Sequence, residues 1–505
     1  MASYIGNWRT RWRFRHIPGP PPSFPLGNMK TIMQKQIFRA HVDWSTRYGD
    51  VFRMFLLQRP VVVVTGKWFS HTCSLVRTGM PRPILSHLQS LSAKRSHRGQ
   101  LWGSLRAGAQ PMFHSHHLSQ YSGIINTAVD GLTGTLSAIA KEGKEVEIMQ
   151  HLGQMTMQVT GAAAFGVDLH AQRGVSEADN KLTTAVKTVF ASSAPSFWFL
   201  LAMLVPAPLQ PLIKTLSARF PDEKLSALHK AYEVVYDVSA TLIENSKRKL
   251  QGKDIGPSDW TWFKRDAGSP YKDAVPDDTS IIPTLLRANN KATGTPLSDM
   301  QIAAQVTTFM LAGYETTHAA LTYCIYLLSK HPDAQSKLLQ EVDQFKGKPN
   351  YEDLGRFPYA TGVLNEAMRI LPPAPLFARI AQEDVQIGSF AVPKGTAVQI
   401  GVFAMHHDER WWQDAEQFKP ERWLGDKTGG DRSGGLAYLP FGAGPRMCIG
   451  IKLAVEEATI ALIRLYQQFT FQLSENCVEP LDLRQAITMA PKGGVPVYVT
   501  QRVKA

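Results

Sequence analysis

The sequence has few cysteines and no long apolar run. Only four cysteines occur in 505 residues, and they lie far apart, at positions 73, 324, 448 and 477. This spacing excludes a CxxC metal motif and the dense disulfide framework of a small secreted domain. We therefore expect a reducing compartment. Because no run of about 18 apolar residues occurs, no segment is expected to span a bilayer.

Acidic residues are also scarce. The chain has 42 Asp and Glu against 55 Lys and Arg, which gives a formal net charge of +13. Such an excess suits an acidic protein partner, an anionic membrane surface or nucleic acid, or it reflects an ordinary basic surface in water. No RNA- or DNA-binding motif occurs, so we expect no nucleic acid partner.

The first 16 residues, MASYIGNWRTRWRFRH, contain four arginines and no acidic residue. This basic N-terminal tail (1–16) lacks the apolar core of a secretory signal. It suits an organelle transit segment, a tether to a membrane surface or the remainder of a removed anchor, and these three alternatives stay open.

The remaining chain alternates between helical and strand-like patterns. Its length alone predicts two or three cores, because single cores stop growing at roughly 250–300 residues. Apolar residues three and four apart predict helices over most of 91–465. The other expected features are a proline-rich hinge at 17–28, two strands within 50–66 around a turn at 58–60, a surface insertion at about 251–278, a hairpin at 383–400 and a closing strand at 492–502.

The most apolar stretch is SFWFLLAMLVPAPLQPL, residues 196–212. It is too short and too interrupted by proline to cross a membrane. Two interpretations stay open: a buried helix end, or a surface flap that dips into the bilayer and covers an apolar pocket.

A lone cysteine lies in FGAGPRMCIG, residues 441–450, directly before the helical pattern of 451–469. Backbone N–H groups at a helix N-terminus favour the thiolate of Cys448, which is the form that binds soft metals. Gly444 permits a tight turn, Gly450 lets the helix approach a flat group, and Arg446 suits an anionic rim. A single thiolate beside a flat space and a cation suits haem, whereas the alternative is a buried cysteine in an ordinary loop.

Several motifs together resemble those of the cytochrome P450 superfamily. FGAGPRMCIG matches its FxxGxRxCxG signature, and AGYETT at 312–317 resembles its oxygen-binding motif. EAMR contains the ExxR residues Glu366 and Arg369, FKPERW contains Arg422 with Trp423 where Phe is usual, and WGSLR contains Trp102 and Arg106 of the WxxxR helix. The resemblance covers about 17–502 and is strongest to the eukaryotic clan of thromboxane synthase and broad-specificity microsomal oxidases.

This resemblance implies one mainly α domain with small β-sheets at 17–505, in place of two or three cores. It implies haem b between a long central helix and the cysteine loop, with Cys448 as the axial thiolate and the only cysteine ligand. Trp102, Arg106, Arg379 and Arg446 are expected around the haem propionates, and His97 lies one turn before Trp102. The haem-binding residues implied are Cys448, Arg446, Phe441, Gly444, Gly450, Trp102, Arg106, Arg379, Ala312 and Gly313.

The central helix is expected over 301–330, with no capping residue in the pattern. Gly313 within it costs roughly 1 kcal/mol, so it needs a packing or functional reason. The resemblance implies that Gly313 makes room for dioxygen and that the catalytic residues Glu315 and Thr316 manage proton delivery.

Glu366 and Arg369 share one helical face at a spacing of three. The resemblance implies a buried structural triad with Arg422 that holds the Cys448 loop, whereas the alternative is an exposed ion pair worth a few tenths of a kcal/mol. Adjacent His406 and His407 point apart on an extended segment, so we expect no second metal there. Substrate contacts are implied for 83–88, 197–204, 309–313, 374–377 and 487–489, which are mostly apolar and suit a lipophilic small molecule.

The function expected is a haem-thiolate monooxygenase that receives electrons from a separate protein. The donor is either an NADPH-dependent cytochrome P450 reductase or a ferredoxin-type protein, because the chain has no flavin or nicotinamide fingerprint. One alternative is a haem-thiolate isomerase or dehydratase acting on a lipid peroxide, and another is a haem-binding sensor without turnover. We expect attachment to a membrane surface, at the cytosolic face of the endoplasmic reticulum or at a plastid or mitochondrial membrane.

Overall fold

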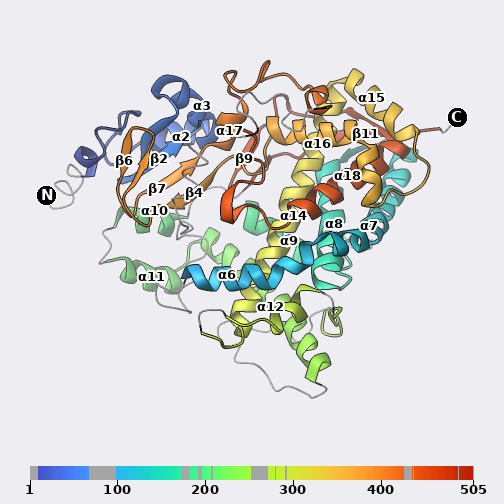
Figure 1. Cartoon of the computed structure of the whole chain (residues 1–505), viewed down its shortest axis with the longest axis horizontal. Coiled ribbons are helices and arrows are strands. Elements are labelled where there is room, and N and C mark those ends of the chain that lie inside the picture. Colours follow the sequence, from blue (N-terminus) through green and yellow to red (C-terminus); the bar gives the residue numbers. More distant parts are fainter. Residues whose placement is uncertain are drawn as a thin grey trace.

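The computed structural model describes residues 10–66, 98–172, 181–191, 196–205, 209–251, 271–278, 280–290, 293–425, 435, 437–486 and 488–503. Helices dominate, and the sheet that contains β2, β4 and β7 lies on the side of the N-terminus, whereas β11 lies near the C-terminus (Figure 1). The expectation of a mainly α protein with small sheets is therefore confirmed. The α-helices are α2 (Met29–Lys35), α3 (Ile37–Tyr48), α6 (Arg98–Ala109), α7 (Ser115–Glu142), α8 (Ile148–Val159), α9 (Lys181–Ala191), α10 (Phe197–Leu204), α11 (Gln210–Arg219), α12 (Glu223–Gln251), α13 (Ile281–Leu286), α14 (Asp299–Lys330), α15 (Pro332–Asp343), α16 (Pro358–Ile370), α17 (Val402–His406) and α18 (Ile451–Gln468).

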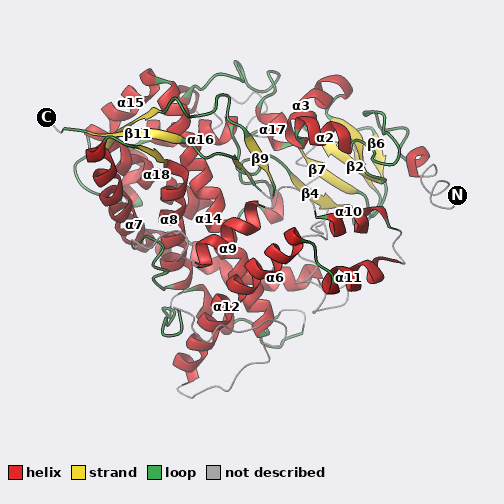
Figure 2. Ribbon diagram, turned by 180° about the vertical axis from the view of Figure 1, so that it is seen from behind, coloured by secondary structure: helices red, strands yellow, loops and turns green. Residues whose placement is uncertain are grey.

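The strands form four small sheets, of which the β1-β2-β7-β4 sheet lies to one side of most of the helices and β11 lies among them (Figure 2). The largest has the order β1-β2-β7-β4, in which β2 and β7 are parallel and the other neighbours antiparallel. The other sheets pair β3-β11-β8, β9-β10 and β5-β6. The strands are β1 (Val51–Leu56), β2 (Arg59–Val64), β3 (Glu145–Glu147), β4 (Phe377–Ile380), β5 (Val385–Ile387), β6 (Phe390–Val392), β7 (Ala397–Ile400), β8 (Phe469–Leu473), β9 (Leu483–Gln485), β10 (Met489–Pro491) and β11 (Pro496–Gln501).

The first hairpin has its turn slightly earlier than expected. Leu57 and Gln58 form the turn, with Leu57 at a φ of 56°, whereas Pro60 lies inside β2. Pairing with β7 begins only at Val61, so the missing N–H of Pro60 interrupts no hydrogen bond on that side. The prediction of a turn at 58–60 was therefore wrong by about one residue.

The proline-rich segment at 17–28 is tied to the first strand. The Arg53 backbone N–H donates to the Pro18 carbonyl at 2.7 Å, and Asn28 Oδ1 accepts from the Phe55 N–H at 2.8 Å. Phe14 and Ile17 are buried in the cluster beneath the sheet. Part of the expected basic tail is thus packed against the protein, and residues 1–9 lie outside the described ranges.

Helix α14 passes through the middle of the molecule, in contact with α8, α12, α16 and α18 (Figure 1). It begins at Asp299, and Ser298 and Gln301 form a capping box there, with side-chain to backbone hydrogen bonds of 3.3 and 3.0 Å. The expectation of an uncapped helix was wrong, because the S-x-x-Q pattern that satisfies the first N–H groups was overlooked. Within the described residues, no helix is both long enough and apolar enough to cross a membrane.

Candidate active site

The turn before α18 is closed by its own backbone. The Cys448 N–H donates to the Phe441 carbonyl at 3.0 Å, and the Met447 N–H donates to the Gly444 carbonyl at 2.9 Å. Gly442 and Gly444 have φ values of 72° and 73°, which residues with a Cβ seldom adopt. Gly444 therefore permits the tight turn, as expected, and Gly442 is a second required glycine that the sequence reasoning missed.

The Cys448 thiol lies in a recess. Its side chain is exposed, although the surrounding protein desolvates it and thereby raises the pKa of the thiol. A hydrogen bond from the Gly450 backbone and the positive charge of Arg106 act in the opposite direction and lower this pKa. Gly450 directly precedes α18, so the helix N-terminus contributes toward the thiolate, although burial has the larger effect and the pKa of Cys448 is raised.

One face of α14 is open halfway along a helix that is otherwise mostly buried. Thr308 and Ala312 are exposed, and Ala304 and Thr316 are half-buried on the same face, four residues apart. Phe113 connects this face with the cysteine turn. Its ring lies 5.8 Å from that of Phe309 on α14, and 3.5 Å from the position that a Cβ on Gly450 would take.

Three guanidinium groups converge next to this turn. The Arg446 guanidinium lies 3.4 Å from the centroid of the Trp102 ring, and Arg106 donates to the Met447 carbonyl at 3.0 Å. Burial, and after it the positive charges of Arg379 and Arg106, lower the pKa of Arg446 to about 10. The structure thus brings Trp102, Arg106, Arg379 and Arg446 together, as predicted, and His97 lies outside the described residues. Such a concentration of positive charge suits an anionic ligand.

These three features fit haem. A recessed thiol can ligate the iron, the open face of α14 leaves room beside it, and the arginines can bind the propionate groups. The chemistry of this donor set therefore defines the site as that of a haem-thiolate protein.

Glu366, Arg369 and Arg422 form a buried network. Arg369 donates to both carboxylate oxygens of Glu366, at 3.0 and 2.9 Å, and Arg422 Nε donates to Oε1 at 2.9 Å. Both Glu366 and Arg369 are 0% exposed, which excludes the alternative of a solvated surface pair. Trp423 Nε1 donates to Oε2 at 2.9 Å, so the residue that replaces the usual Phe supplies a further donor.

His406 connects this network with the cysteine loop. Its Nδ1 donates to the Arg369 carbonyl at 3.0 Å, and its Nε2 accepts from the Leu439 N–H at 2.9 Å. Burial, aided by the charge of Arg369, lowers the pKa of His406 to about 3, so the imidazole is neutral. The neighbouring His407 instead bonds Glu416 and the Ile370 carbonyl, both at 2.8 Å. Sequence reasoning considered His406 only as a possible metal ligand, which it rejected, and missed this contact. The expectation of an extended segment was wrong, because His406 is the last residue of α17.

The structure gives Gly313 a packing reason. A Cβ at this position would lie 2.5 Å from Thr160 Oγ1 in the π-helical turn η3 (Thr160–Phe165), which is closer than atoms can approach. The close contact between α14 and this turn therefore accounts for the glycine, and the role implied for dioxygen stays a prediction.

Glu315 and Thr316 are not brought together. The Thr316 hydroxyl lies on the open face of α14 and donates to the Ala312 carbonyl at 2.8 Å. Glu315 is 2% exposed and accepts from Arg484 at 2.6 Å and from Thr488 at 3.2 Å. Arg484 had no signal in the sequence, because it lies 169 residues further along the chain.

The segments expected to contact substrate are only partly described. Residues 83–88 and 487 lie outside the described ranges. Phe197 in α10 is 62% exposed, and none of the other α10 side chains that the structure describes is buried, which argues against a buried helix end. Phe309 and Leu311 are half-buried beside the open face of α14.

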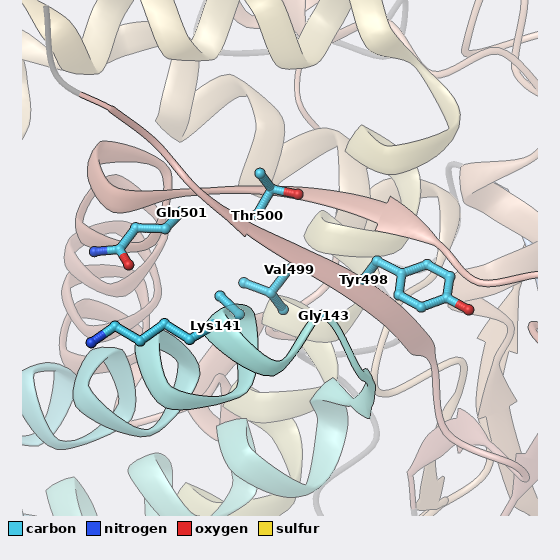
Figure 3. A pocket seen from close by; sticks show the side chains of 7 residues that line it. Lys141, Gly143, Tyr498, Val499, Thr500 and Gln501 are labelled. Carbon is cyan, nitrogen blue, oxygen red and sulfur yellow. The ribbon is translucent and has the colours of Figure 1, made fainter.

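Two surface cavities contain none of these residues. One of about 430 Å³ lies between the end of α7 and β11 and is bordered by Lys141, Gly143 and Tyr498 (Figure 3). The other, of about 380 Å³, lies at the start of α15 near His331 and Phe418. Neither contains a cysteine or a set of catalytic groups, so the chemistry belongs to the recess at Cys448.

The comparisons with known proteins agree with this site. The family model for cytochrome P450 matches residues 17–496. The chain therefore belongs to the cytochrome P450 family, whose members bind haem iron through a cysteine thiolate, and it is a cytochrome P450 monooxygenase with Cys448 in the ligand position.

Similar proteins include cytochrome P450 3A9 of Rattus norvegicus, which is 30% identical over 96% of this chain and 91% of the relative. Cytochrome P450 3A13 of Mus musculus is 29% identical over 96% of this chain and 91% of the relative. Thromboxane-A synthase of Sus scrofa is 28% identical over 96% of this chain and 92% of the relative. The resemblance to the clan of thromboxane synthase and broad-specificity oxidases is thereby confirmed.

Proposed function

We propose that this protein inserts one atom of dioxygen into a lipophilic small molecule, with electrons from a separate donor protein. The observation that carries the proposal is the open face of α14, where Thr308 and Ala312 are exposed and Thr316 is half-buried in the middle of a helix whose second half is almost entirely buried. Haem, when bound, supplies the activation of dioxygen and the insertion chemistry.

The residues of the chain hold and orient the reactants. Arg106, Arg379 and Arg446 fix the haem carboxylates, and Cys448 supplies the thiolate. Thr316 donates its single hydroxyl hydrogen to the Ala312 carbonyl, and its two lone pairs can accept hydrogen bonds, so it can pass on a proton by exchanging the bond to Ala312 for one to a reactant. Phe113 and Phe309 pack against each other at the side of α14 that faces the cysteine turn, and this apolar pair suits a lipophilic substrate.

The electron donor and the membrane are inferred from charge and exposure. The net charge of +13 suits an acidic donor, either an NADPH-dependent cytochrome P450 reductase or a ferredoxin-type protein. Phe197, Leu209, Leu212 and Phe220 are all more than half exposed on or beside α10 and α11. This apolar patch suits attachment to a membrane surface, at the cytosolic face of the endoplasmic reticulum or at an organelle membrane.

A second candidate is an isomerase or dehydratase that acts on a lipid peroxide and needs neither reductant nor proton delivery. The observation that favours it is the ion pair of Glu315 with Arg484, which keeps this acid away from Thr316. A thromboxane-A synthase among the relatives supports the same alternative.

Labelled dioxygen separates the two candidates. With a reductase and a library of lipophilic compounds, the monooxygenase forms a product that contains one labelled atom, and Thr316→Ala lowers the product formed per reduced cofactor by roughly tenfold or more. Haem binding and substrate affinity should remain near those of the wild type, because the hydroxyl bonds only a backbone carbonyl. Equal conversion of a lipid peroxide by both proteins, without a reductase, would contradict the proposal and favour the isomerase.

A further inference from the structure

Arg484 on β9 connects three parts of the molecule through one guanidinium group. One terminal nitrogen donates to Glu315 on α14 at 2.6 Å, and the other donates to the Phe190 carbonyl on α9 at 2.7 Å. Thr488, at the turn between β9 and β10, donates to the same Glu315 oxygen at 3.2 Å. The β9-β10 hairpin thus contacts the acid expected to supply protons.

The contact with α9 has its own physical reason. Phe190 is the residue before the last one of α9, where helix carbonyls have no partner within the helix. The last turn of α9 contains no basic residue, so Arg484 provides the cation that favours a helix C-terminus. A single side chain therefore satisfies both the helix end and the buried carboxylate.

The hairpin is held firmly in place. The Met489 N–H donates to the Pro373 carbonyl at 2.8 Å, and the Tyr323 hydroxyl donates to the Met489 carbonyl at 2.7 Å. The Gln36 side-chain amide also donates to the Leu483 carbonyl. Because the backbone on both sides of Arg484 is fixed, the guanidinium is presented to Glu315 from a rigid support.

Glu315 points away from the open face of α14. Successive residues of an α-helix are about 100° apart, so the side chain of Glu315 leaves the helix on a different face from Thr316. Besides Arg484, the titratable groups that face Glu315 are His318 and Tyr323, both on α14. The positive charge of Lys187 on α9 also acts on His318 and lowers its pKa. His318 Nε2 lies 3.7 Å from Glu315 Oε2, and its Nδ1 donates to the Tyr314 carbonyl at 2.7 Å.

We propose that Arg484 is a positioning residue that restrains Glu315 and thereby makes proton supply to the open face depend on the β9-β10 hairpin and the end of α9. This inference rests on the proposed function, because it takes Glu315 as the proton source for Thr316. The hairpin provides the fixed support, and movement of the end of α9 weakens the hold of Arg484 on the carboxylate and lets it turn towards the open face. Thr488 lies in the segment expected to contact substrate, so a bound substrate acts directly on this restraint.

Removal of the guanidinium has a defined chemical consequence. Glu315 would remain buried without its closest cation, and a buried carboxylate in that situation takes up a proton. Arg484→Gln should therefore show an infrared carbonyl band of a protonated carboxyl group in addition to those of the wild type, in which burial already raises the pKa of Glu456 and Glu457. The additional band should disappear again in the double variant Arg484→Gln/Glu315→Gln. This readout does not depend on turnover.

The matched control is Arg502, which has the same pattern of contacts elsewhere. It donates to Asp343 and to the Tyr466 carbonyl near the end of α18, both at 2.6 Å, and its side chain is 18% exposed against 15% for Arg484. Asp343 is 52% exposed, so Arg502→Gln should give no additional protonated carboxyl band. An additional band in both variants would show that the signal does not report on Glu315.

The functional test measures the product formed per reduced cofactor as a function of pH. Arg484→Gln should lower this ratio about tenfold and make it pH-dependent, whereas Arg484→Lys should restore most of it. In a Glu315→Gln background, Arg484→Gln should cause no further change, because Arg484 acts through that carboxylate. All variants are first required to show the thiolate-type spectrum of the reduced carbon monoxide complex.

Two results would overturn the inference. The first is wild-type behaviour of Arg484→Gln in both the infrared measurement and the product formed per reduced cofactor. The second is that Arg484→Gln and Glu315→Gln lower this ratio independently, so that the double variant shows the sum of their effects. If the wild type forms no oxygenated product with any donor, the proposed function fails. The infrared comparison then still decides whether Arg484 controls the protonation of Glu315.

Discussion

Glu366 and Glu315 are both buried carboxylates paired with arginine, but they differ in how completely they are bonded. Glu366 receives donors on both oxygens from Arg369, Arg422, Trp423 and the Lys419 backbone. Glu315 receives its two donors on Oε1, and the group nearest to Oε2 is His318 at 3.7 Å. A carboxylate with both oxygens bonded is fixed in position, whereas one bonded through a single oxygen can exchange partners. The comparison favours a structural role for Glu366 and agrees with the role in proton supply that we propose for Glu315.

The largest effect is expected from loss of the thiolate that the Glu366 network helps to present. Cys448→Ser should abolish the thiolate-type spectrum of the reduced carbon monoxide complex and all product formation, because a hydroxyl does not replace the soft ligand. Cys477→Ser is the control and should keep that spectrum. Retention of the spectrum by Cys448→Ser would remove the basis for the whole site.

The direct test of the comparison exchanges each acid for its amide. Glu366→Gln should lower the free energy of unfolding by about 3–5 kcal/mol, because it leaves the fully buried Arg369 without a counter-charge. Glu315→Gln should cost less, about 1–3 kcal/mol, because Arg484 keeps its bond to the Phe190 carbonyl and is not fully buried. The measurements are denaturant unfolding and product per reduced cofactor. Equal losses of stability from the two substitutions would contradict the assignment.

The sequence predicted the network of Glu366 with Arg369 and Arg422. It also pointed to Glu315, but not to Arg484 as the partner of this carboxylate. Glu366 and Arg369 are three residues apart on one helix, and Cys448 lies in a dense local motif, so short-range patterns were sufficient. The β1-β2 hairpin and α18 were predicted for the same reason. Arg484, and the contact of His406 with Leu439, depend on how distant segments pack, and no local periodicity encodes such pairings. Ser298 and Gln301 show the other kind of miss, in which a readable local pattern was overlooked.

Acidification should lower the free energy of unfolding through His406, which lies beside the Glu366 network. Its pKa in the folded protein is about 3 instead of 6.5, so between these values the unfolded chain binds one more proton than the folded protein does. Stability therefore rises with pH across this window and falls on acidification, by about 1.4 kcal/mol per pH unit for this group, or about 2 kcal/mol between pH 6.5 and pH 5.

The slope of unfolding free energy against pH checks this prediction. His406→Gln should reduce the slope by about one proton in the mildly acidic range, whatever it does to absolute stability. His41 is also buried, and burial lowers its pKa to about 3. His41→Phe should therefore reduce the slope of unfolding free energy against pH by a similar amount, independently of His406. Slopes identical to the wild type would show that these imidazoles titrate normally in the folded protein.

The smallest effect on stability is expected from Trp423, whose indole donates a hydrogen bond to Glu366. Trp423→Phe removes the donor to Oε2 but leaves the bonds from Arg369 and Arg422, so we expect a loss of about 1–2 kcal/mol. Trp412→Phe is the matched control, because this ring lies 5.9 Å from Trp423 and its indole nitrogen has no hydrogen-bond partner among the described residues. The two substitutions remove similar ring volume, so the difference between their unfolding free energies measures the hydrogen bond to Glu366. If Trp412→Phe costs as much as Trp423→Phe, the indole donor adds nothing, and the arginines alone fix this carboxylate.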